Sequence, residues 1–338
     1  MSTTSKSPKK VAQTAYHIGK NTLADYSHPF SPKKFTQPQL FVCLVLKTFF
    51  KTDYRGIVEI LKDCSELAEA CELKTIPHYT TVQKASRRLL KKDATQKMLA
   101  ETISVVMDEQ KHIKLAALDA TGIESGHISP YFLTRRSNSQ KPKRNTQLTR
   151  WPKLAVIVDV ATHLILAVHP CRGSGRDISH FKRILNALPK PWTVKQLLAD
   201  AGYDGEYAHR YAREILNIET TIPPLIGRRP RGLPRTTYRR QMKTNFDTET
   251  FGQRWQVETV FSMIKRNLGH SVFGRNYWSQ CRDMMLLVLT HNVMIVLFVK
   301  ELFYKAPIGW ILAVLSALVL SQATMGSFSQ LPSCSSEV

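Results

Sequence analysis

Residues 115–122 read Leu-Ala-Ala-Leu-Asp-Ala-Thr-Gly, and residues 197–203 read Leu-Leu-Ala-Asp-Ala-Gly-Tyr. Each stretch opens with a short apolar run that predicts a buried strand, and each run ends at an aspartate, Asp119 or Asp200. In open α/β sheets, ligands bind just outside the carboxyl ends of the strands. A carboxylate there is expensive to desolvate unless it is paired or bound to a metal ion. Either aspartate alone suits a turn or a cap. The two together favour a functional site as much as they favour turn or cap roles.

The segments around these runs alternate between strand and helix patterns. Apolar runs predict strands over 113–118, 154–159, 164–168, 194–199 and 219–222. Helical periodicity predicts helices over 177–188, 206–216 and 248–268, the last one ended by Gly269. Three strands, a helix, a strand and then helices is the element order of a ribonuclease H-like fold. We therefore expect an α/β fold whose ribonuclease H-like catalytic domain, a mixed sheet with flanking helices, covers residues 111–275.

A small all-α DNA-binding domain is expected before the catalytic domain. Residues 1–35 are rich in Lys, Ser, Thr and Pro and predict a basic mobile arm. Residues 36–110 show helical periodicity, and the third helix begins after 77–79 with Thr80 or Thr81 as its cap. It carries a basic stripe with the spacing i, i+3, i+4 and i+7, formed by Lys84, Arg87, Arg88 and Lys91. The stripe fits a helix that docks on DNA, and a solvated face is its alternative.

The charge of the chain indicates a polyanionic partner. Its formal net charge is +22, which favours nucleic acid first and an anionic membrane surface second. Charge alone does not imply an enzyme, because structural RNA binders share it. None of the six cysteines forms a C-x-x-C pair, so we expect reduced thiols in a cytoplasmic, nucleoid-associated protein.

The C-terminal segment 276–338 is expected to form helices and an apolar tail. No charged residue lies between Ala306 and Ser336. The apolar core of this stretch is shorter than the roughly 18–20 residues that a membrane span needs. A buried helix is therefore favoured over an insertion-prone tail, and a membrane partner is not expected.

The helix expected over 248–268 supplies a third carboxylate. Four side chains with the spacing i, i+3, i+7 and i+14 fall on one face, namely Phe251, Arg254, Glu258 and Lys265. A neighbouring apolar stripe that includes Val257 and Ile264 would seat this helix on the sheet. Glu258 would then lean over the strand ends beside Asp119 and Asp200. The alternative is an ordinary amphipathic helix with a surface glutamate.

Three carboxylates brought together repel one another and raise one another's pKa values, and a divalent cation removes that conflict. Asp119, Asp200 and Glu258 are therefore the candidate catalytic and metal-ligating residues. Mg²⁺ or Mn²⁺ suits such all-oxygen ligands. Two ions roughly 4 Å apart would activate the attacking oxygen and stabilise the leaving oxygen in a displacement at phosphorus.

These residues resemble a known family, the insertion-sequence transposases of the DDE type that carry a Tyr-x2-Arg-x3-Glu-x6-Lys signature. The signature is present here as Phe251, Arg254, Glu258 and Lys265, with Phe251 in place of the tyrosine. Asp119 matches the family's first aspartate in its Asp-Ala-Thr-Gly setting, and Asp200 matches the second in Asp-Ala-Gly-Tyr. The stretch 76–81 is also similar to the helical leader of this group.

The resemblance implies a DNA transposase that cleaves the ends of its element and joins them to target DNA with divalent metal ions. It further implies a homo-oligomer on DNA, no small-molecule substrate, and phosphate contacts by Arg254 and Lys265. The short interval between Asp200 and Glu258 holds a loop at 227–243 in place of the larger domain of some relatives. Phosphate contact, against a plain exposed loop, is favoured for its Arg228, Arg229, Arg231, Arg235, Arg239 and Arg240.

Four other carboxylates receive lesser roles: Asp159 suits a hairpin and Asp177 a helix cap, while Glu124 and Asp204 are possible neighbours of the metal ligands. Two alternatives to an active transposase stay open. One is an inactive or regulatory nucleic-acid-binding relative, and the other is a different ribonuclease H-like nuclease such as a resolvase. The His180–Arg183 pair has the spacing found in tyrosine recombinases, but no further partners for such a site are identifiable.

Overall fold

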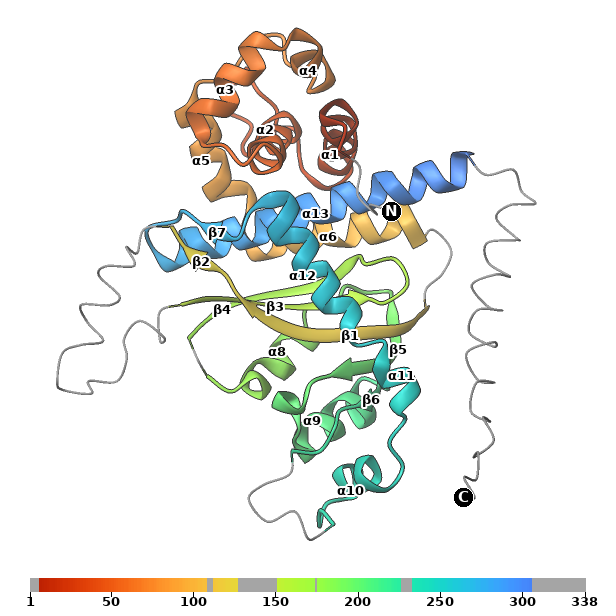
Figure 1. Ribbon diagram of the computed structural model, residues 1–338. Helices are drawn as coiled ribbons and strands as arrows, with labels where there is room; N and C mark the ends of the chain where they lie inside the picture. Colours follow the sequence, from red (N-terminus) through yellow and green to blue (C-terminus); the bar gives the residue numbers. More distant parts are fainter. Residues whose placement is uncertain (1–5, 108–111, 127–150, 174, 226–232, 306–338) are drawn as a thin grey trace, which may run out of the picture.

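A five-stranded mixed sheet lies at the centre of the protein, which we describe from a computed structural model (Figure 1). The structure describes residues 6–107, 112–126, 151–173, 175–225 and 233–305, with side chains up to residue 298. The strand order is β4-β3-β1-β5-β6. The bounds are β1 His112–Gly122, β3 Pro152–Asp159, β4 Ile165–Arg172, β5 Thr193–Ala199 and β6 Glu219–Thr221. All five strands were expected from the sequence, although β1, β3 and β4 extend further than the apolar runs indicated.

The register of the sheet follows from its connections. β3 and β4 form an antiparallel hairpin, and β3 is also antiparallel to β1. Asp159 closes the hairpin turn by accepting hydrogen bonds from the backbone nitrogen and the hydroxyl of Thr162, which confirms its expected role. β5 returns parallel to β1, and β6 parallel to β5. A parallel return needs a crossover, and short helices between β4 and β5 provide it.

Both faces of the sheet are buried, because side chains alternate between two hydrophobic clusters. In β1, Ala117 belongs to the first cluster, whereas Ala116 and Leu118 belong to the second. The first face is covered by α12 (Trp255–Leu268), α13 (Tyr277–Lys305) and α6 (Lys92–Met107). Short helical segments cover the second face. They are η2 Asp177–His180, α8 Phe181–Leu185, η3 Ala201–Tyr203, α9 Glu206–Arg210 and the π-helix η4 Tyr211–Ile215.

A group of short helices lies above α13 in Figure 1. Its members are α1 Pro8–Thr22, α2 Gln37–Phe49, α3 Tyr54–Asp63, α4 Ser65–Ala70 and α5 Tyr79–Leu89. The prediction of a mobile arm over residues 1–35 is wrong for the residues of α1, because this helix packs on α2, α4, α6 and α13. Val11, Ala15 and Ile18 are fully buried at helical spacing, so this Lys-rich segment has an apolar stripe. Burial of the stripe offsets the conformational entropy that the segment loses when it becomes ordered.

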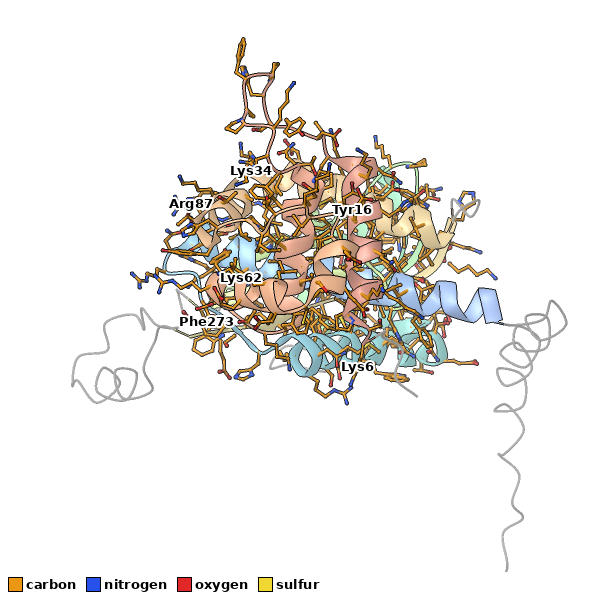
Figure 2. The ribbon with its side chains drawn as sticks, turned by 90° about the horizontal axis from the view of Figure 1, so that it is seen from above. Lys6, Tyr16, Lys34, Lys62, Arg87 and Phe273 are labelled. Carbon is orange, nitrogen blue, oxygen red and sulfur yellow. The ribbon has the colours of Figure 1, made fainter. Side chains whose placement is uncertain are left out.

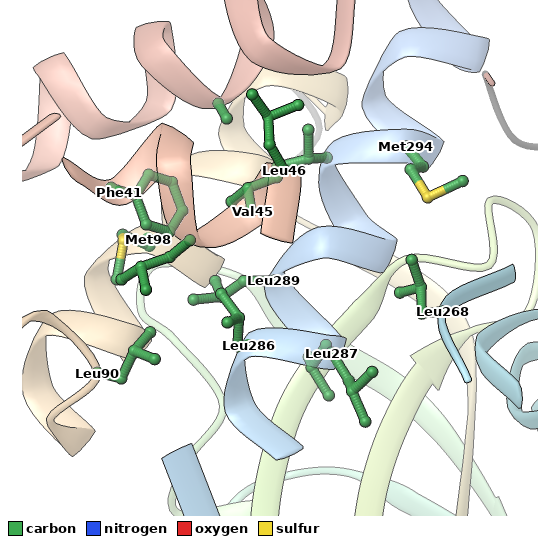
Figure 3. Packing of buried hydrophobic residues seen from close by; sticks show 14 of the residues in the cluster. Phe41, Val45, Leu46, Leu90, Met98, Leu268, Leu286, Leu287, Leu289 and Met294 are labelled. Atoms are coloured by element: carbon green, nitrogen blue, oxygen red, sulfur yellow. The ribbon is translucent and has the colours of Figure 1, made fainter. Parts of the chain in front are cut away.

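Helix α13 joins the helical group to the sheet. Figure 3 shows Leu286, Leu289 and Met294 of this helix among residues of α2, α6 and α12. Asn292 adds a polar link to β4, because its amide accepts from the backbone nitrogen of Ile165 at 3.0 Å and donates to the carbonyl of the same residue at 2.9 Å. Of the described segments, only 277–298 is long and apolar enough to cross a membrane, with a mean hydropathy of 1.5, and 83% of it is buried inside the protein. It therefore has the properties of a core helix.

Two expected helices are broken in the structure. The helix expected over 248–268 consists of α11 (Thr248–Gly252) and α12, separated at Gln253. Asp247 caps α11 by accepting from the backbone nitrogen of Thr250 at 2.9 Å, and Gly269 ends α12 with a φ of 104° as expected. The helix expected over 177–188 is the shorter pair η2 and α8. The loop expected over 227–243 contains the start of α10 (Thr237–Thr244).

Candidate active site

Asp119 and Asp200 occupy corresponding positions on two neighbouring strands. The last paired residues of β1 and β5 are Leu118 and Ala199, and the two aspartates follow them directly. β1 does not end at Asp119 as expected, because it continues to Gly122 in pairing with β3. The sheet therefore holds the backbone of Asp119 on one side, while Asp200 lies where β5 ends. The parallel register brings both carboxylates to the same edge of the sheet.

Asp200 is held at the start of η3. Its carboxylate accepts from the backbone nitrogen of Ala201 at 2.7 Å, and its carbonyl accepts from Tyr203 at 2.9 Å. The residue is exposed. Its carboxylate is thus oriented by a local turn and open to solvent, which is the condition a metal ligand requires before the ion binds.

Arg254 connects Asp119 with Glu258. It is the N-cap residue of α12, directly after the break from α11. Its Nη1 lies 3.3 Å from Oδ2 of Asp119, and its Nη2 lies 2.6 Å from Oε1 of Glu258. The guanidinium side chain is 21% exposed, whereas that of Glu258 is 57% exposed. One cation therefore already bridges two of the three candidate carboxylates.

The electrostatics of Asp119 favour binding of a cation. Burial raises the pKa of its carboxyl most strongly, and the negative charges of Asp200 and Asp177 raise it further. The backbone nitrogen of Ala120 and the charge of Arg254 act in the opposite direction. The net effect disfavours the charged form of Asp119, and any additional cation at the sheet edge would relieve this.

Lys265 and Phe251, the outer members of the signature, lie on different structural elements. Lys265 donates from Nζ to Oγ1 of Thr121 at 2.8 Å, which places it beside β1 two residues after Asp119. Phe251 belongs to α11, and its ring packs edge-on against Phe246 with centroids 5.1 Å apart. Phe251 therefore supports the turn before α12 by apolar contact and offers no polar group.

Asp177 is a fourth carboxylate near the sheet edge, and its role differs from the helix cap that its sequence pattern predicts. It does not cap a helix, because Arg176 is the N-cap residue of η2 and no side-chain cap is formed. Its carboxylate instead pairs with the ammonium of Lys153 on β3. Tyr203 lies nearby, is 1% exposed and has a pKa raised by burial and by the charges of Asp177 and Asp119. Its phenol thus stays protonated at neutral pH.

The residues expected to bind metal fit hard oxygen chemistry but are not assembled around one point. Among the residues that the structure describes, no three Asp, Glu, His or Cys side chains are grouped closely enough to hold an ion. Asp119 and Glu258 nevertheless share one cationic partner, and Asp200 follows the strand beside Asp119. Carboxylate oxygens are the donors that Mg²⁺ and Mn²⁺ prefer. The donor set therefore fits a divalent ion, provided that Arg254 releases Asp119.

The basic stripe of α5 is divided between surface and structure. Lys84, Arg87 and Lys91 are exposed, whereas Arg88 is half-buried and donates from Nε to Gln37 at 3.2 Å. Helix α5 ends at Leu89, so Lys91 lies beyond it, and His78 instead of Thr80 or Thr81 is its N-cap. Lys84 and Arg87 are thus exposed on the surface of α5, while Arg88 links α5 to α2.

The Arg-rich segment also contains a structural residue. Arg239 of α10 forms a two-pronged ion pair with Asp204, whose side chain is 1% exposed, with Nη2 2.7 Å from Oδ2. Asp204 is therefore a buried anchor for α10. Arg235 and Arg240 are exposed, and Arg240 donates to the carbonyl of Pro234. Arg228, Arg229 and Arg231 lie outside the described residues.

Glu124 is also separate from the candidate metal ligands. It belongs to β2 (Glu124–Ser125), which pairs with β7 (Ser271–Val272), and its carboxylate lies 3.4 Å from Nε2 of His270. The side chains of both residues are more than 60% exposed. Glu124 therefore belongs to the surface of this small second sheet.

A comparison with known proteins identifies the family of this chain. The family model of the transposase DDE domain matches residues 110–293, more than half of the 338-residue chain, and the matched range contains all three candidate carboxylates. A mixed α/β sheet with carboxylates at one strand edge is consistent with that class of enzyme. The chain belongs to the DDE transposase family.

The other comparisons are more distant. A solved piggyBac transposase synaptic complex with hairpin DNA has 10% sequence identity and a TM-score of 0.39, over 89% of this chain and 79% of that chain. No curated protein matches the sequence.

Proposed function

We propose that the protein is an active transposase that cuts the ends of its element and joins the resulting 3′-hydroxyl to target DNA. The observation that carries this proposal is the convergence of Asp119, Arg254 and Glu258, which come from β1 and the start of α12. Structural roles alone give no reason for a partly buried aspartate with a raised pKa to lie beside Asp200 at the edge of a sheet. Phosphoryl transfer on DNA does give one, because it needs such carboxylates.

The topology supports a ribonuclease H-like catalytic domain. A hairpin and the strand before it form three antiparallel strands, and two further strands extend the sheet in parallel from the other side of β1. This is the arrangement expected from the order of elements in the sequence. In it, the first and fourth strands in chain order are neighbours and carry Asp119 and Asp200 to one edge.

The proposed metal ligands are Asp119, Asp200 and Glu258. Bound Mg²⁺ or Mn²⁺, in one or two ions, would activate the attacking oxygen and neutralise charge on the leaving oxygen. Before such binding, Arg254 holds Asp119 and Glu258 near each other and limits their repulsion. After release of Asp119, the guanidinium is placed to hold a DNA phosphate beside the scissile bond, as is Lys265 from Thr121.

Neither Tyr203 nor position 251 of the signature offers a nucleophilic tyrosine. Tyr203, the tyrosine of the Asp-Ala-Gly-Tyr stretch, is 1% exposed and has a raised pKa. A nucleophilic tyrosine must reach phosphorus and lose its proton, and Tyr203 meets neither condition. Phe251 supplies no hydroxyl in place of the signature tyrosine. Water and the DNA 3′-hydroxyl are the nucleophiles that we propose for the metal-dependent reaction.

The proposal is tested with purified protein and a supercoiled plasmid that carries the gene with its native flanking DNA. We expect cleavage at the flanks and strand joining with Mg²⁺ or Mn²⁺. Asp119→Asn, Asp200→Asn and Glu258→Gln should each lose cleavage by about a thousandfold or more, because a metal ion contributes several kcal/mol to such a reaction. DNA binding should survive in all three variants.

The matched control is Glu249→Gln, which removes one exposed carboxylate from α11 and should cleave like wild type. Cleavage in EDTA, or a protein–DNA adduct that survives denaturation, would contradict the metal-dependent mechanism. Wild-type protein that binds DNA but never cleaves it would support the inactive, regulatory relative instead.

A further inference from the structure

A groove lined by cationic side chains lies between the helical group and the start of α13. Its volume is about 840 Å³. The end of α2, the start of α3 and the face of α5 form one wall, and the segment 273–283 forms the other. We call this cavity the basic groove, after its five cations Lys47, Lys51, Arg87, Arg275 and Arg282. In Figure 2, Arg87 and Phe273 mark the same side of the molecule, where the groove lies.

The anionic residues in the groove are already satisfied by the backbone. Asp53 caps α3 by accepting from the nitrogens of Arg55 and Gly56 at 2.9 and 2.7 Å. Asp283 accepts from the nitrogens of Phe273 and Gly274 at 3.2 and 2.9 Å. Two carboxylates thus face five cations, and each carboxylate already accepts hydrogen bonds from the backbone of the groove walls. The groove keeps an excess of positive charge.

Three of the five cations are less well satisfied than the anions, whereas Lys51 donates to the carbonyl of Arg266 at 2.8 Å. Within the described part of the chain, Arg275 and Arg282 donate no hydrogen bond and form no ion pair. Lys47 lies with its ammonium 5.0 Å from the centre of the Tyr54 ring, and burial lowers its pKa. Such a partly desolvated cation is stabilised by an incoming anion.

The groove is connected to the candidate active site. A smaller cavity of about 310 Å³ shares Lys47, Lys51 and Phe273 with it and is also lined by Lys265. Lys265 in turn donates to Thr121, two residues beyond Asp119. A continuous series of cations therefore runs from the carboxylates, along the end of α12, into the basic groove.

We propose that the basic groove binds the phosphate backbone of the DNA strand that is cut at Asp119, Asp200 and Glu258. The proposal rests on the proposed function and adds a binding site for the DNA next to the cut. Phosphate oxygens would give Arg275 and Arg282 ion-pair partners and would add negative charge beside Lys47, which already faces Asp283 and Asp53. The exposed ring of Phe273, 67% accessible, lies at the rim and offers an apolar surface to a sugar or base. Helix α5 contributes Arg87, so the groove also explains how the helical group and the catalytic sheet act on one DNA molecule.

The first test measures salt-dependent binding of a fluorescent duplex taken from the gene's flanking DNA. Arg87→Gln/Arg275→Gln should lower the slope of log affinity against log salt by about two and weaken binding roughly tenfold, since each lost phosphate contact removes about 0.9 from the slope. The control is Lys114→Gln/Lys195→Gln, which removes the same charge from exposed positions of β1 and β5 at the far end of the sheet. Equal slopes for the two double variants would overturn the proposal.

The second test uses unmodified protein and measures lysine acetylation by mass spectrometry. DNA should protect Lys51 and Lys265 severalfold and leave Lys195 unchanged. Protection of Lys51 by polyglutamate but not by DNA would overturn the proposal and indicate an acidic protein partner. The two failures are distinguishable. If the groove is not a DNA site but the proposed function is right, carboxylate variants still lose cleavage while Lys51 stays reactive on DNA. If the proposed function is wrong, the wild-type protein never cleaves DNA. In that case DNA can still protect Lys51, because protection measures binding and not cleavage.

Discussion

Arg254 and Asp119 are 135 positions apart in the sequence, yet Nη1 of Arg254 lies 3.3 Å from Oδ2 of Asp119. The same guanidinium bonds Glu258. Because this arginine is the N-cap residue of α12, the first turn of the helix lies at the sheet edge with a cation between two carboxylates. We interpret Arg254 as a residue that keeps the acidic site assembled before a metal ion and DNA bind.

The pKa of Asp119 leads to a prediction about stability. Its raised value means that the folded protein binds the proton more tightly than the unfolded chain does, so ionisation of this residue opposes folding. Asp119→Asn should therefore raise the free energy of unfolding at neutral pH. The gain should be absent below the ordinary pKa of 3.8 and grow as the pH rises through the raised folded value.

Urea denaturation of both proteins across this pH range, without divalent metal, measures the difference. Asp200→Asn, at an exposed carboxylate, is the comparison variant and should show a smaller change. A wild type that is more stable than Asp119→Asn at neutral pH would mean that the ion pair with Arg254 outweighs burial.

The pair of Arg239 and Asp204 predicts a large effect on stability. Arg239→Ala leaves a carboxylate that is 1% exposed without its two-pronged partner and should cost about 3–5 kcal/mol. Arg240→Ala, on the same helix, removes an exposed arginine and should change stability by less than about 0.5 kcal/mol. Thermal unfolding of the two variants separates the roles, and similar melting temperatures would show that Arg239 is a surface residue in solution.

Asn292 predicts how α13 is joined to β4. Asn292→Ala removes the partner of the backbone nitrogen and carbonyl of Ile165 and should cost at least about 2 kcal/mol. Thr102→Val removes only the hydroxyl that accepts from the same amide, at 3.0 Å, and should cost about 1 kcal/mol. Chemical denaturation measures the free energy of unfolding of both variants. Equal losses would mean that the contact with Thr102, and not the link to β4, accounts for the effect of Asn292→Ala.

The sheet was predictable from the sequence because its signals are local. Apolar runs marked all five strands, and the aspartates that follow two of them indicated the candidate site. The φ of 104° at Gly269 shows why a glycine ends α12. The break before Arg254 also had a local signal, since Gly252 weakens a helix interior.

Other features depend on contacts that no local pattern carries. The sequence of α1 resembles a mobile arm, because its small apolar stripe is diluted by lysines and is stabilised by burial against α2, α4, α6 and α13. Arg239 looked like its exposed neighbours, and only its distant partner Asp204 distinguishes it. Asp177 likewise matched a cap pattern, but its partner Lys153 comes from another strand.

The central claim is that Asp119, Asp200 and Glu258 bind the catalytic metal ion, and a change of metal specificity tests it most directly. Asp119→Cys, Asp200→Cys and Glu258→Cys replace an oxygen ligand by sulfur, which Mg²⁺ binds poorly and the softer Mn²⁺ accepts better. The measurement is DNA cleavage by each variant in Mg²⁺ and in Mn²⁺, with the alanine variants in parallel. We predict that the cysteine variants are inactive in Mg²⁺ and regain cleavage in Mn²⁺, while the alanine variants stay inactive in both. Cysteine variants that cleave equally well in Mg²⁺ and Mn²⁺ would contradict the claim that these residues bind the metal.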